Sequence, residues 1–347
     1  MALIIQPNAA FMVPLKNQGQ EKVYRAYDLN ILGYSDSELR RRYRFGRRSI
    51  EYLVDTLRDD LKRPTNRGHA LTVEQQVLIA LRFYASGSFL QVVGDTLGVD
   101  KSCVSRVVRD VTDALVARKD AYITWPTDAE HLRTIQSGFY QLGGFPNVIG
   151  CIDGTHVRIQ APTRDEPAYV NRKGYHSINV QAVCDHEGRL TNVCAKWPGA
   201  AHNSHLFRTS ALCHHLEQHH TRIADGFILG DNGYPCRPFL LTPYFNPHGQ
   251  PEQRYNDSLC ATRVTIERTF GRWKRRFHVL HSEVRMEPSR VCCIVVACAV
   301  LHNIAIDMCE PDDDRANIDE QPPVEAYGGR HDGKGIRDHI ARTFFAQ

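Results

Sequence analysis

The apolar residues of this chain change their spacing once, near residue 145, and this change limits the folds that the chain can adopt. Before it, apolar residues recur every three or four positions, as on helices that bury one face. After it, short apolar or alternating runs predict strands. These runs are VIGCIDGTHVRIQAP, HSINVQAVCD, RLTNVCAKWPG and FILGDNGYP. The order predicts an α/β sheet domain behind an all-α N-terminal domain.

The chain has 347 residues, enough for two domains. We predict an extended N-terminal segment over residues 1–34, a helical domain over 35–120, an α/β domain over 121–309 and a disordered tail over 310–347. The tail holds nine acidic and five basic residues and is rich in turn residues, a composition that favours disorder. Within the α/β domain, the HEGR stretch is expected to turn a hairpin between two strands.

Residues 72–116 of the helical domain have the spacing of a helix-turn-helix. Gly98 supplies a turn, and Asp100 is suited to cap the last of three helices. Val104 and Val107 would hold that helix against the other two. Its outer face would enter a DNA groove with Ser102, Ser105, Arg106 and Arg109. The same spacing also fits a three-helix bundle used for self-association.

Charge and cysteine content indicate a polyanionic partner and a reducing compartment. The formal net charge is +4, but the tail carries −4, so residues 1–309 carry +8. A basic body favours a partner such as DNA, with solubility as the alternative. The eleven cysteines are an odd number without a CxxC pair. Because no signal peptide is recognisable and the apolar run Cys292–Ile306 is shorter than a bilayer span, we expect a nuclear protein without a membrane partner, cytoplasmic before import.

Two aspartates stand where apolar strands end or are interrupted. Asp153 follows VIGCI, and Asp231 follows FILG. An ionised carboxylate beside a buried strand is costly unless it is paired, hydrogen-bonded or bound to a metal. With Glu267 they offer three oxygen ligands of the kind that hard divalent cations take, as in two-metal phosphoryl-transfer sites. For each aspartate taken singly, an ordinary turn at a strand end is the alternative.

Glu267 lies in the segment RVTIERTFGRWKRRF, residues 263–277, where six basic residues surround one acid. This arrangement suits a helix whose acid binds metal and whose bases bind a phosphate backbone. The bases on the neighbouring face are Arg268, Arg272 and Arg275. The alternative is an ordinary surface helix in which Glu267 forms ion pairs with Arg263 and Lys274.

The chain resembles the PIF/Harbinger family of DDE transposases through motifs that follow one another between residues 40 and 307. They are GCIDGTHVRIQAP, YVNRKGYHSINVQAVCD, PGAAHNSHLF, LGDNGYP, IERTFGRWKRRF and VLHN. The resemblance implies a ribonuclease H-like catalytic domain whose catalytic and metal-binding triad is Asp153, Asp231 and Glu267. It also implies two Mg²⁺ or Mn²⁺ ions, excision and integration at terminal inverted repeats, and a Myb-like accessory protein.

Four further polar residues near these motifs are candidate auxiliary or DNA-contacting residues. His156 would touch the scissile phosphate or lie on the other face of its strand. Lys173 and His176 would face DNA or the rim of the site, with a solvated loop as the alternative. Asn203 stands where many relatives carry Asp, and we interpret it as a neighbour of the metal ligands rather than a ligand.

These observations predict a DNA transposase that attacks a phosphodiester with metal-activated water and then joins the freed 3′-hydroxyl to a target. Its partners would be double-stranded DNA, both inverted repeats and target site, and a second copy of the chain, because two ends must be brought together. The alternatives are a domesticated nuclease without transposition and a non-catalytic DNA-binding protein.

Overall fold

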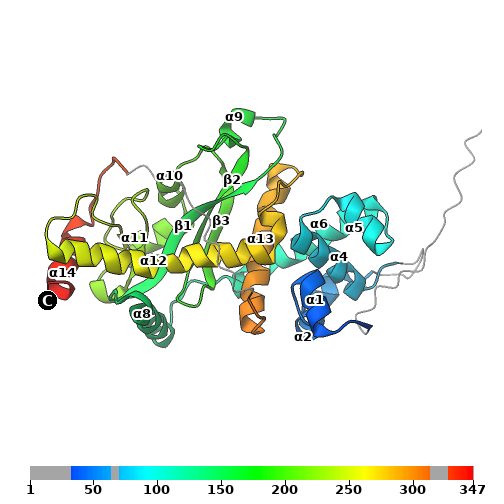
Figure 1. Cartoon of the computed structure of the whole chain (residues 1–347), viewed down its shortest axis with the longest axis horizontal. Helices are drawn as coiled ribbons and strands as arrows, with labels where there is room; N and C mark the ends of the chain where they lie inside the picture. Colours follow the sequence, from blue (N-terminus) through cyan, green and yellow to red (C-terminus); the bar gives the residue numbers. More distant parts are fainter. Residues whose placement is uncertain (1–32, 64–69, 313–326, 347) are drawn as a thin grey trace, which may run out of the picture.

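The computed structural model describes residues 33–63, 70–312 and 327–346; most of the predicted N-terminal segment and the middle of the predicted tail therefore lie outside the described residues. The N-terminal helices are α1 (Asp36–Tyr43), α2 (Arg47–Thr56), α3 (Arg58–Leu61), α4 (Val73–Ser86), α5 (Leu90–Leu97), α6 (Lys101–Ala117) and α7 (Lys119–Tyr122). They form one end of the molecule, and the sheet and its covering helices form the other (Figure 1).

The sheet part contains five strands and several helices, as the change in apolar spacing predicts. The strands are β1 (Val148–Arg158), β2 (Ser177–Cys184), β3 (Leu190–Pro198), β4 (Phe227–Leu229) and β5 (Leu240–Leu241). The helices are α8 (Ala129–Gly143), α9 (Glu166–Tyr169), α10 (Asn203–Arg208), α11 (Ala211–His219), α12 (Gln250–Arg276), α13 (Pro288–Asp307) and α14 (Lys334–Phe344). Short 3₁₀ turns span Ile223–Asp225 and His278–Leu280.

The strands lie in the order β3-β2-β1-β4-β5. β1 pairs antiparallel with β2 and parallel with β4, and β4 pairs parallel with β5. β2 and β3 form the predicted hairpin. Its HEGR turn is closed by Asp185, whose side chain accepts hydrogen bonds from the backbone N–H groups of Glu187 and Arg189 at 3.0 and 2.9 Å. The predicted α/β sheet is therefore confirmed.

Helix α12 lies along one face of the sheet and packs on β1, β2 and α8 (Figure 1). Its 27 residues make it about 40 Å long at 1.5 Å per residue. Its buried stripe includes Ile266, Phe270 and Trp273. The other face of the sheet is covered by a separate apolar cluster that joins Ile152 of β1 to Phe207 of α10 and to residues of α11. The two faces of β1 therefore have different neighbours.

Helix α13 lies between the N-terminal helices and the sheet, and contacts α6, α7, β3 and α12. It is long and apolar enough to cross a membrane by length and composition, but 67% of its most apolar window is buried inside the molecule. A helix that is apolar around its whole circumference is typical of a buried core element. We therefore interpret α13 as a core helix shared by both parts of the chain.

Helices α4, α5 and α6 occupy the positions expected of the predicted helix-turn-helix segment. Gly98 ends α5 with a left-handed backbone (φ 73°), and the Asp100 side chain caps α6 by accepting from the Ser102 N–H at 2.8 Å. Val104 and Val107 are buried. The residues predicted to enter DNA are exposed on α6: Ser102, Ser105, Arg106 and Arg109. Whether this face binds DNA stays a prediction.

The expectation of a disordered tail is wrong for its described residues. Residues 334–344 form α14, which buries Ile340 and Ala341 in the main core. Phe345 packs its ring 5.6 Å from that of Phe145. The prediction of disorder rested on the acidic, turn-rich composition before residue 334, and it overlooked the short helix that begins at this residue.

Glu310, the first residue of the predicted tail, is buried and joins the two parts of the molecule. Its carboxylate accepts hydrogen bonds from the Arg40 guanidinium and the Gly46 N–H, both at 2.7 Å, and from the Ser49 hydroxyl. Burial opposes the charged form, but these three donors together lower the pKa of Glu310. An ionised Glu310 therefore stabilises the docking of α1 and α2 beside the end of α13.

We predict that Glu310→Gln lowers the free energy of unfolding by about 2 kcal/mol at pH 7, because charge-assisted hydrogen bonds are lost in a buried site. A carboxylate whose folded pKa is lowered contributes its stability above the unfolded pKa and loses it as pH falls through the folded pKa. Urea unfolding at several pH values should therefore show the difference shrinking below about pH 4.

The control is Asp113→Asn, which breaks the half-exposed ion pair between Asp113 and Arg290. It should change the unfolding free energy by less than about 0.5 kcal/mol. An equal loss in both variants would contradict the role assigned to Glu310.

Candidate active site

Asp153 lies in the middle of β1, 1% exposed, with both carboxylate oxygens engaged. Its Oδ1 accepts from the Gly154 N–H at 2.7 Å, and its Oδ2 accepts from the Arg263 guanidinium at 2.9 Å. Cys151, two residues earlier on the same face of the strand, donates from its thiol to the Thr262 carbonyl of α12 at 3.6 Å. Strand alternation therefore turns Asp153 toward α12.

Asp231 follows β4 at the level of Asp153. The parallel register pairs Cys151 of β1 with Leu229 of β4, so each aspartate lies two residues beyond this pair. Asp231 is 9% exposed, and its Oδ1 accepts from the Gly233 N–H at 2.9 Å. Adjacent parallel strands thus bring two acids together from positions 78 residues apart in the sequence.

Glu267 reaches the same place from α12, four residues after Arg263. The Arg263 guanidinium donates one N–H to Glu267 Oε1 at 2.5 Å and another to Asp153, so it bridges two carboxylates. Arg263 is 17% exposed and Glu267 22% exposed. The predicted alternative pair between Arg263 and Glu267 therefore exists, but it belongs to a largely buried cluster rather than to an ordinary surface helix.

Electrostatics tie the three acids to one another. Burial raises the pKa of Asp153, and the negative charge of Asp231 raises it further, while Arg263 opposes both effects. Burial likewise raises the pKa of Asp231; Arg263 lowers it and Glu267 raises it. Arg263 keeps its proton despite burial, because the three carboxylates raise the pKa of its guanidinium. The cluster holds more negative charge than one arginine neutralises.

The predicted DNA-contacting residues of α12 have different environments. Arg268 is exposed. Arg272 forms an ion pair with Asp312 at 3.1 Å and donates to the Glu187 carbonyl at 3.0 Å, so it already has partners within the chain. Arg275 is partly buried and also interacts within the chain. Of these three arginines, Arg268 is the one whose side chain is exposed to solvent.

His156 lies on the opposite face of β1 from Asp153, which is one of the two positions that the sequence allows. Its Nδ1 is hydrogen-bonded to the Ser177 hydroxyl at 3.0 Å. Burial, and then the charges of Lys274 and Lys173, lower the pKa of His156 to about 4. The structure therefore does not bring this imidazole together with the carboxylates, and it is neutral at physiological pH.

Asn203 also lies behind the strand. A Cβ at Gly154 would come within 2.4 Å of Asn203 Oδ1, so the glycine leaves the space that this side chain fills. Asn203 Oδ1 accepts from the Asn179 side-chain amide at 3.2 Å. Because Asp153 and Gly154 point to opposite faces of β1, Asn203 lies on the face away from Asp153, and its role beside the metal ligands stays a prediction.

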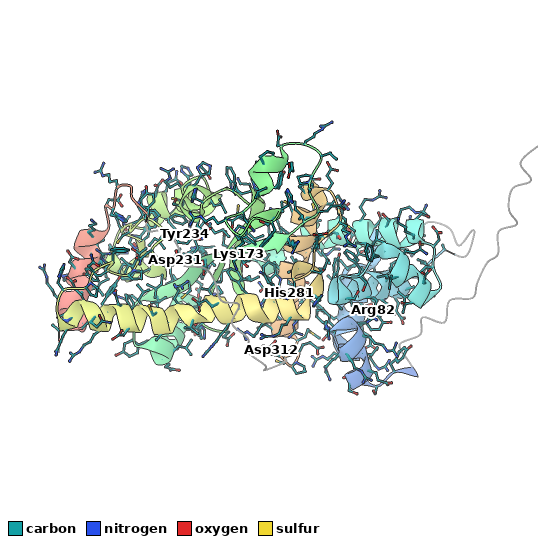
Figure 2. All side chains as sticks on the ribbon, turned by 45° about the horizontal axis from the view of Figure 1, so that its top comes forward. Arg82, Lys173, Asp231, Tyr234, His281 and Asp312 are labelled. Carbon is teal, nitrogen blue, oxygen red and sulfur yellow. The ribbon has the colours of Figure 1, made fainter. Side chains whose placement is uncertain are left out.

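The loop before β2 carries the other two predicted residues. Lys173 is exposed, and His176 is hydrogen-bonded to Glu166 of α9 at 2.5 Å. Figure 2 labels Lys173 together with Asp231 on the sheet part of the molecule. His176 is occupied by its own loop, whereas Lys173 presents its charge to solvent.

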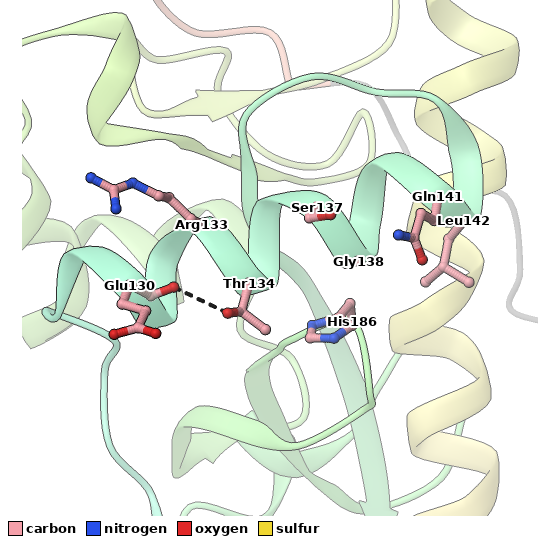
Figure 3. A pocket seen from close by; sticks show the side chains of 8 residues that line it. All are labelled: Glu130, Arg133, Thr134, Ser137, Gly138, Gln141, Leu142 and His186. Atoms are coloured by element: carbon pink, nitrogen blue, oxygen red, sulfur yellow. Dashed lines mark hydrogen bonds between the residues drawn. The ribbon is translucent and has the colours of Figure 1, made fainter.

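A groove of about 550 Å³ lies elsewhere, along α8 (Figure 3). It is lined by seven residues of α8 and by His186 of the β2–β3 turn. The residues of the carboxylate cluster do not line it, so the cluster and this groove are separate features.

Two basic residues of α12 make contacts with β1 that sequence reasoning did not predict. Arg263 was considered as a partner of Glu267, but its contact with Asp153 depends on how α12 packs on β1. Lys274 is 9% exposed and donates to the His156 carbonyl at 3.1 Å, which fixes α12 against the same strand. The four- and seven-residue intervals that separate Arg263, Glu267 and Lys274 on one helix face were the available signal.

Comparison with known proteins identifies the family. Residues 152–303 match the family described as DDE superfamily endonuclease. HARBI1 of Homo sapiens, whose name marks it as a candidate nuclease, is 39% identical over 298 residues, covering 84% of this chain and 85% of the human protein. The chain belongs to the Harbinger-related DDE endonuclease family. The resemblance inferred from the sequence motifs is therefore confirmed.

Other relatives of this Harbinger-related chain include HARBI1 of Mus musculus, 40% identical over 276 residues that cover 79% of this chain and 78% of the mouse protein. A protein of Microchaete diplosiphon, named as a candidate transposase for insertion sequence element IS702, is 23% identical over 252 residues, with 69% and 83% covered. No solved structure matches the chain.

DDE endonucleases generally use divalent metals, and the donor chemistry of the cluster fits such ions. Carboxylate oxygens are the ligands of hard cations. Burial, and then repulsion from a neighbouring acid, raise the pKa of Asp153 and of Asp231 against the opposing charge of Arg263, and a bound cation would offset both effects. In the described ranges, no three His, Cys, Asp or Glu side chains are already grouped closely enough to hold one ion together. Arg263 lies between Asp153 and Glu267 instead.

We predict that Asp231→Asn raises the free energy of unfolding by about 1 kcal/mol in EDTA at pH 8, because it removes a buried charge repelled by Glu267. A carboxylate with a raised folded pKa destabilises the fold as pH rises past its unfolded pKa. The gain should therefore vanish near pH 4, where both states take up the proton. Urea unfolding measures both values.

Asp257→Asn serves as the control, because Asp257 is an exposed acid on α12 that accepts from Gln253. It should leave the unfolding free energy unchanged. A loss of stability in Asp231→Asn, with Asp257→Asn unchanged, would show that Asp231 is a net stabilising charge and contradict the prediction.

Proposed function

We propose that the chain is a DNA transposase that cuts DNA strands and transfers them at terminal inverted repeats. The observation that carries the proposal is the convergence of Asp153, Asp231 and Glu267 on one arginine, from two strands and one helix, in a member of a DDE endonuclease family. The strand order β3-β2-β1-β4-β5, with two antiparallel pairs followed by two parallel pairs, supports a ribonuclease H-like catalytic domain.

In this proposal the three carboxylates hold two Mg²⁺ or Mn²⁺ ions. The chemistry that the ions supply when bound is activation of the attacking oxygen and stabilisation of the leaving oxygen in an in-line displacement. Arg263 orients Asp153 and Glu267 through its two N–H groups and offsets part of their charge. No covalent link between protein and DNA is needed.

DNA would be held by basic side chains on both parts of the chain. On the sheet part, Arg268 of α12 and Lys173 of the loop before β2 are exposed. On the helical part, the exposed face of α6 carries Ser102, Ser105, Arg106 and Arg109. Phosphate contacts of this kind supply affinity and position the duplex, whereas base contacts supply specificity. We further propose assembly as a dimer or larger complex, a Myb-like accessory protein and a nuclear location.

The catalytic prediction concerns cleavage of DNA that carries the inverted repeats flanking the gene. With Mn²⁺, Asp153→Asn and Glu267→Gln should each lower the cleavage rate by about 10³-fold or more, because each removes a charged group that acts in the transition state. Gel analysis of labelled ends measures the rate. Asp257→Asn, on the exposed side of the same helix as Glu267, should cut at the wild-type rate.

A nuclease without transposition is the second candidate, favoured by the name of the human relative. The same assay separates the two, because a transposase joins the freed 3′ end to a target duplex and a nuclease stops after cleavage. A non-catalytic DNA-binding protein would bind the repeats and show full binding but no Mn²⁺-dependent product. Cleavage at the wild-type rate by Glu267→Gln would contradict the role assigned to the carboxylates.

The DNA-binding prediction concerns α6. Replacing both Arg106 and Arg109 with Ala should weaken binding to the repeats and make the slope of log K against log salt shallower by about 2, as expected for two lost phosphate contacts. Fluorescence anisotropy at several salt concentrations measures both. Replacing Arg58 and Arg222, which are exposed in other elements, with Ala is the matched control. An unchanged slope in the Arg106/Arg109 variant would favour the self-association bundle.

A further inference from the structure

Residues 327–345, near the C-terminus, pack on the loop that follows Asp231. We call them the C-terminal arm; the arm contains α14 and lies at the opposite end of the molecule from the N-terminal helices (Figure 1). The loop, residues 232–237, leads from Asp231 toward β5. The arm lies outside residues 152–303, the part of the chain that matches the DDE endonuclease family. Its contacts with the loop therefore need an explanation of their own.

Backbone hydrogen bonds join the arm to both ends of this loop. The Tyr327 N–H donates to the Asn232 carbonyl at 2.8 Å, and the Gly333 N–H donates to the Cys236 carbonyl at 3.0 Å. A Cβ at Gly333 would come within 2.3 Å of the backbone carbonyl carbon of Arg237, so the two backbones lie in direct contact there. The arm is therefore closely fitted to the loop.

The imidazole of His331 links the loop to the backbone of the arm. Its Nδ1 accepts from the Cys236 N–H at 3.0 Å, and its Nε2 is hydrogen-bonded to the Tyr327 carbonyl at 3.1 Å. Because a backbone N–H can only donate and a carbonyl can only accept, these two bonds require the tautomer with its proton on Nε2. The next residue, Asp332, forms an ion pair with Arg237 at 3.0 Å. His331 thus uses both ring nitrogens to hold the arm against the loop.

One peptide unit, which joins Asn232 to Gly233, connects these contacts to Asp231. Its carbonyl accepts from the Tyr327 N–H, and its own N–H donates to Asp231 Oδ1 at 2.9 Å. A peptide unit is planar and trans, so its C=O and N–H point in opposite directions and turn together. Fixing the carbonyl therefore fixes the N–H that holds the carboxylate. The Tyr327 backbone is in turn held by His331.

We propose that His331 is a positioning residue for Asp231. By binding the backbones of Tyr327 and Cys236, it keeps the peptide unit after Asp231 in the orientation that holds the carboxylate. The inference rests on the proposed function, in which Asp231 is a metal ligand, and deepens it by adding the C-terminal arm to the site. The competing role is that of a structural anchor, in which His331 holds the arm without affecting the carboxylate.

The first test compares His331→Ala with Asp338→Ala in the free protein in EDTA. Asp338 is the matched control, because it is also a partly buried residue of the arm and accepts from the Tyr244 hydroxyl at 2.7 Å, outside the loop. Each variant should lower Tm by about 2 °C, as expected for one lost hydrogen bond. Amide hydrogen exchange over residues 232–237 should become roughly fivefold faster in His331→Ala and stay unchanged in Asp338→Ala.

The second test measures cleavage of the inverted-repeat DNA in Mn²⁺. His331→Ala should lower kcat roughly tenfold while the Kd for DNA stays at the wild-type value, because a loosely held carboxylate is misoriented at the reacting centre. Asp338→Ala should keep the wild-type kcat. His331→Gln, whose amide offers one acceptor and one donor as the imidazole does, should recover kcat to within about threefold of the wild type.

Two results would overturn the inference alone. One is a wild-type kcat in His331→Ala, and the other is an equal loss of kcat in both alanine variants, which would show that His331 is only a structural anchor. If the wild-type chain shows no Mn²⁺-dependent cleavage, the proposed function fails, and the positioning role fails with it.

Discussion

One largely buried guanidinium, that of Arg263, offsets part of the charge of acids contributed by three separate elements. Desolvation and mutual repulsion both favour the neutral form of buried carboxylates, so such a cluster needs a cation to stay ionised. Arg263 supplies it from the helix that also carries Glu267. Sliding α12 by one residue along β1 would turn both side chains by about 100° and break the arrangement. The packing of one helix on one strand is therefore the constraint on which the site depends.

The backbone sets the remaining geometry. The parallel register of β1 and β4 fixes Asp153 and Asp231 at one level. The turn after β4 holds Asp231 through the hydrogen bond from the Gly233 N–H. On the reverse side of β1, Gly154 leaves room for Asn203, so the strand can be covered closely behind the acids. Lys274 adds a contact from α12 to β1 on the other side. Each contact restricts the strand on which Asp153 stands, which favours a rigid site over a mobile one.

Much of this arrangement follows from local sequence signals. The change from helical to alternating spacing predicted the order of helices and strands, the HEGR turn predicted the hairpin, and Asp100 marked the start of α6. The contacts of Arg263 could not be predicted in the same way, because they depend on the register between elements about 110 residues apart. The helix α14 was missed because its few apolar residues follow an acidic segment and pack against α12, while Phe345, the residue after the helix, packs against Phe145 and Tyr255. Long-range packing, rather than propensity, decides both cases.

Helix α13 has a consequence for how the chain holds together. Its apolar circumference is covered on one side by the N-terminal helices and on the other by the sheet and α12, so neither covering makes a complete core without it. The N-terminal helices and the sheet are therefore thermodynamically coupled. We expect them to unfold in one cooperative transition rather than as two independent domains. A fragment that lacks either part would expose the apolar surface of α13 to water and would tend to aggregate.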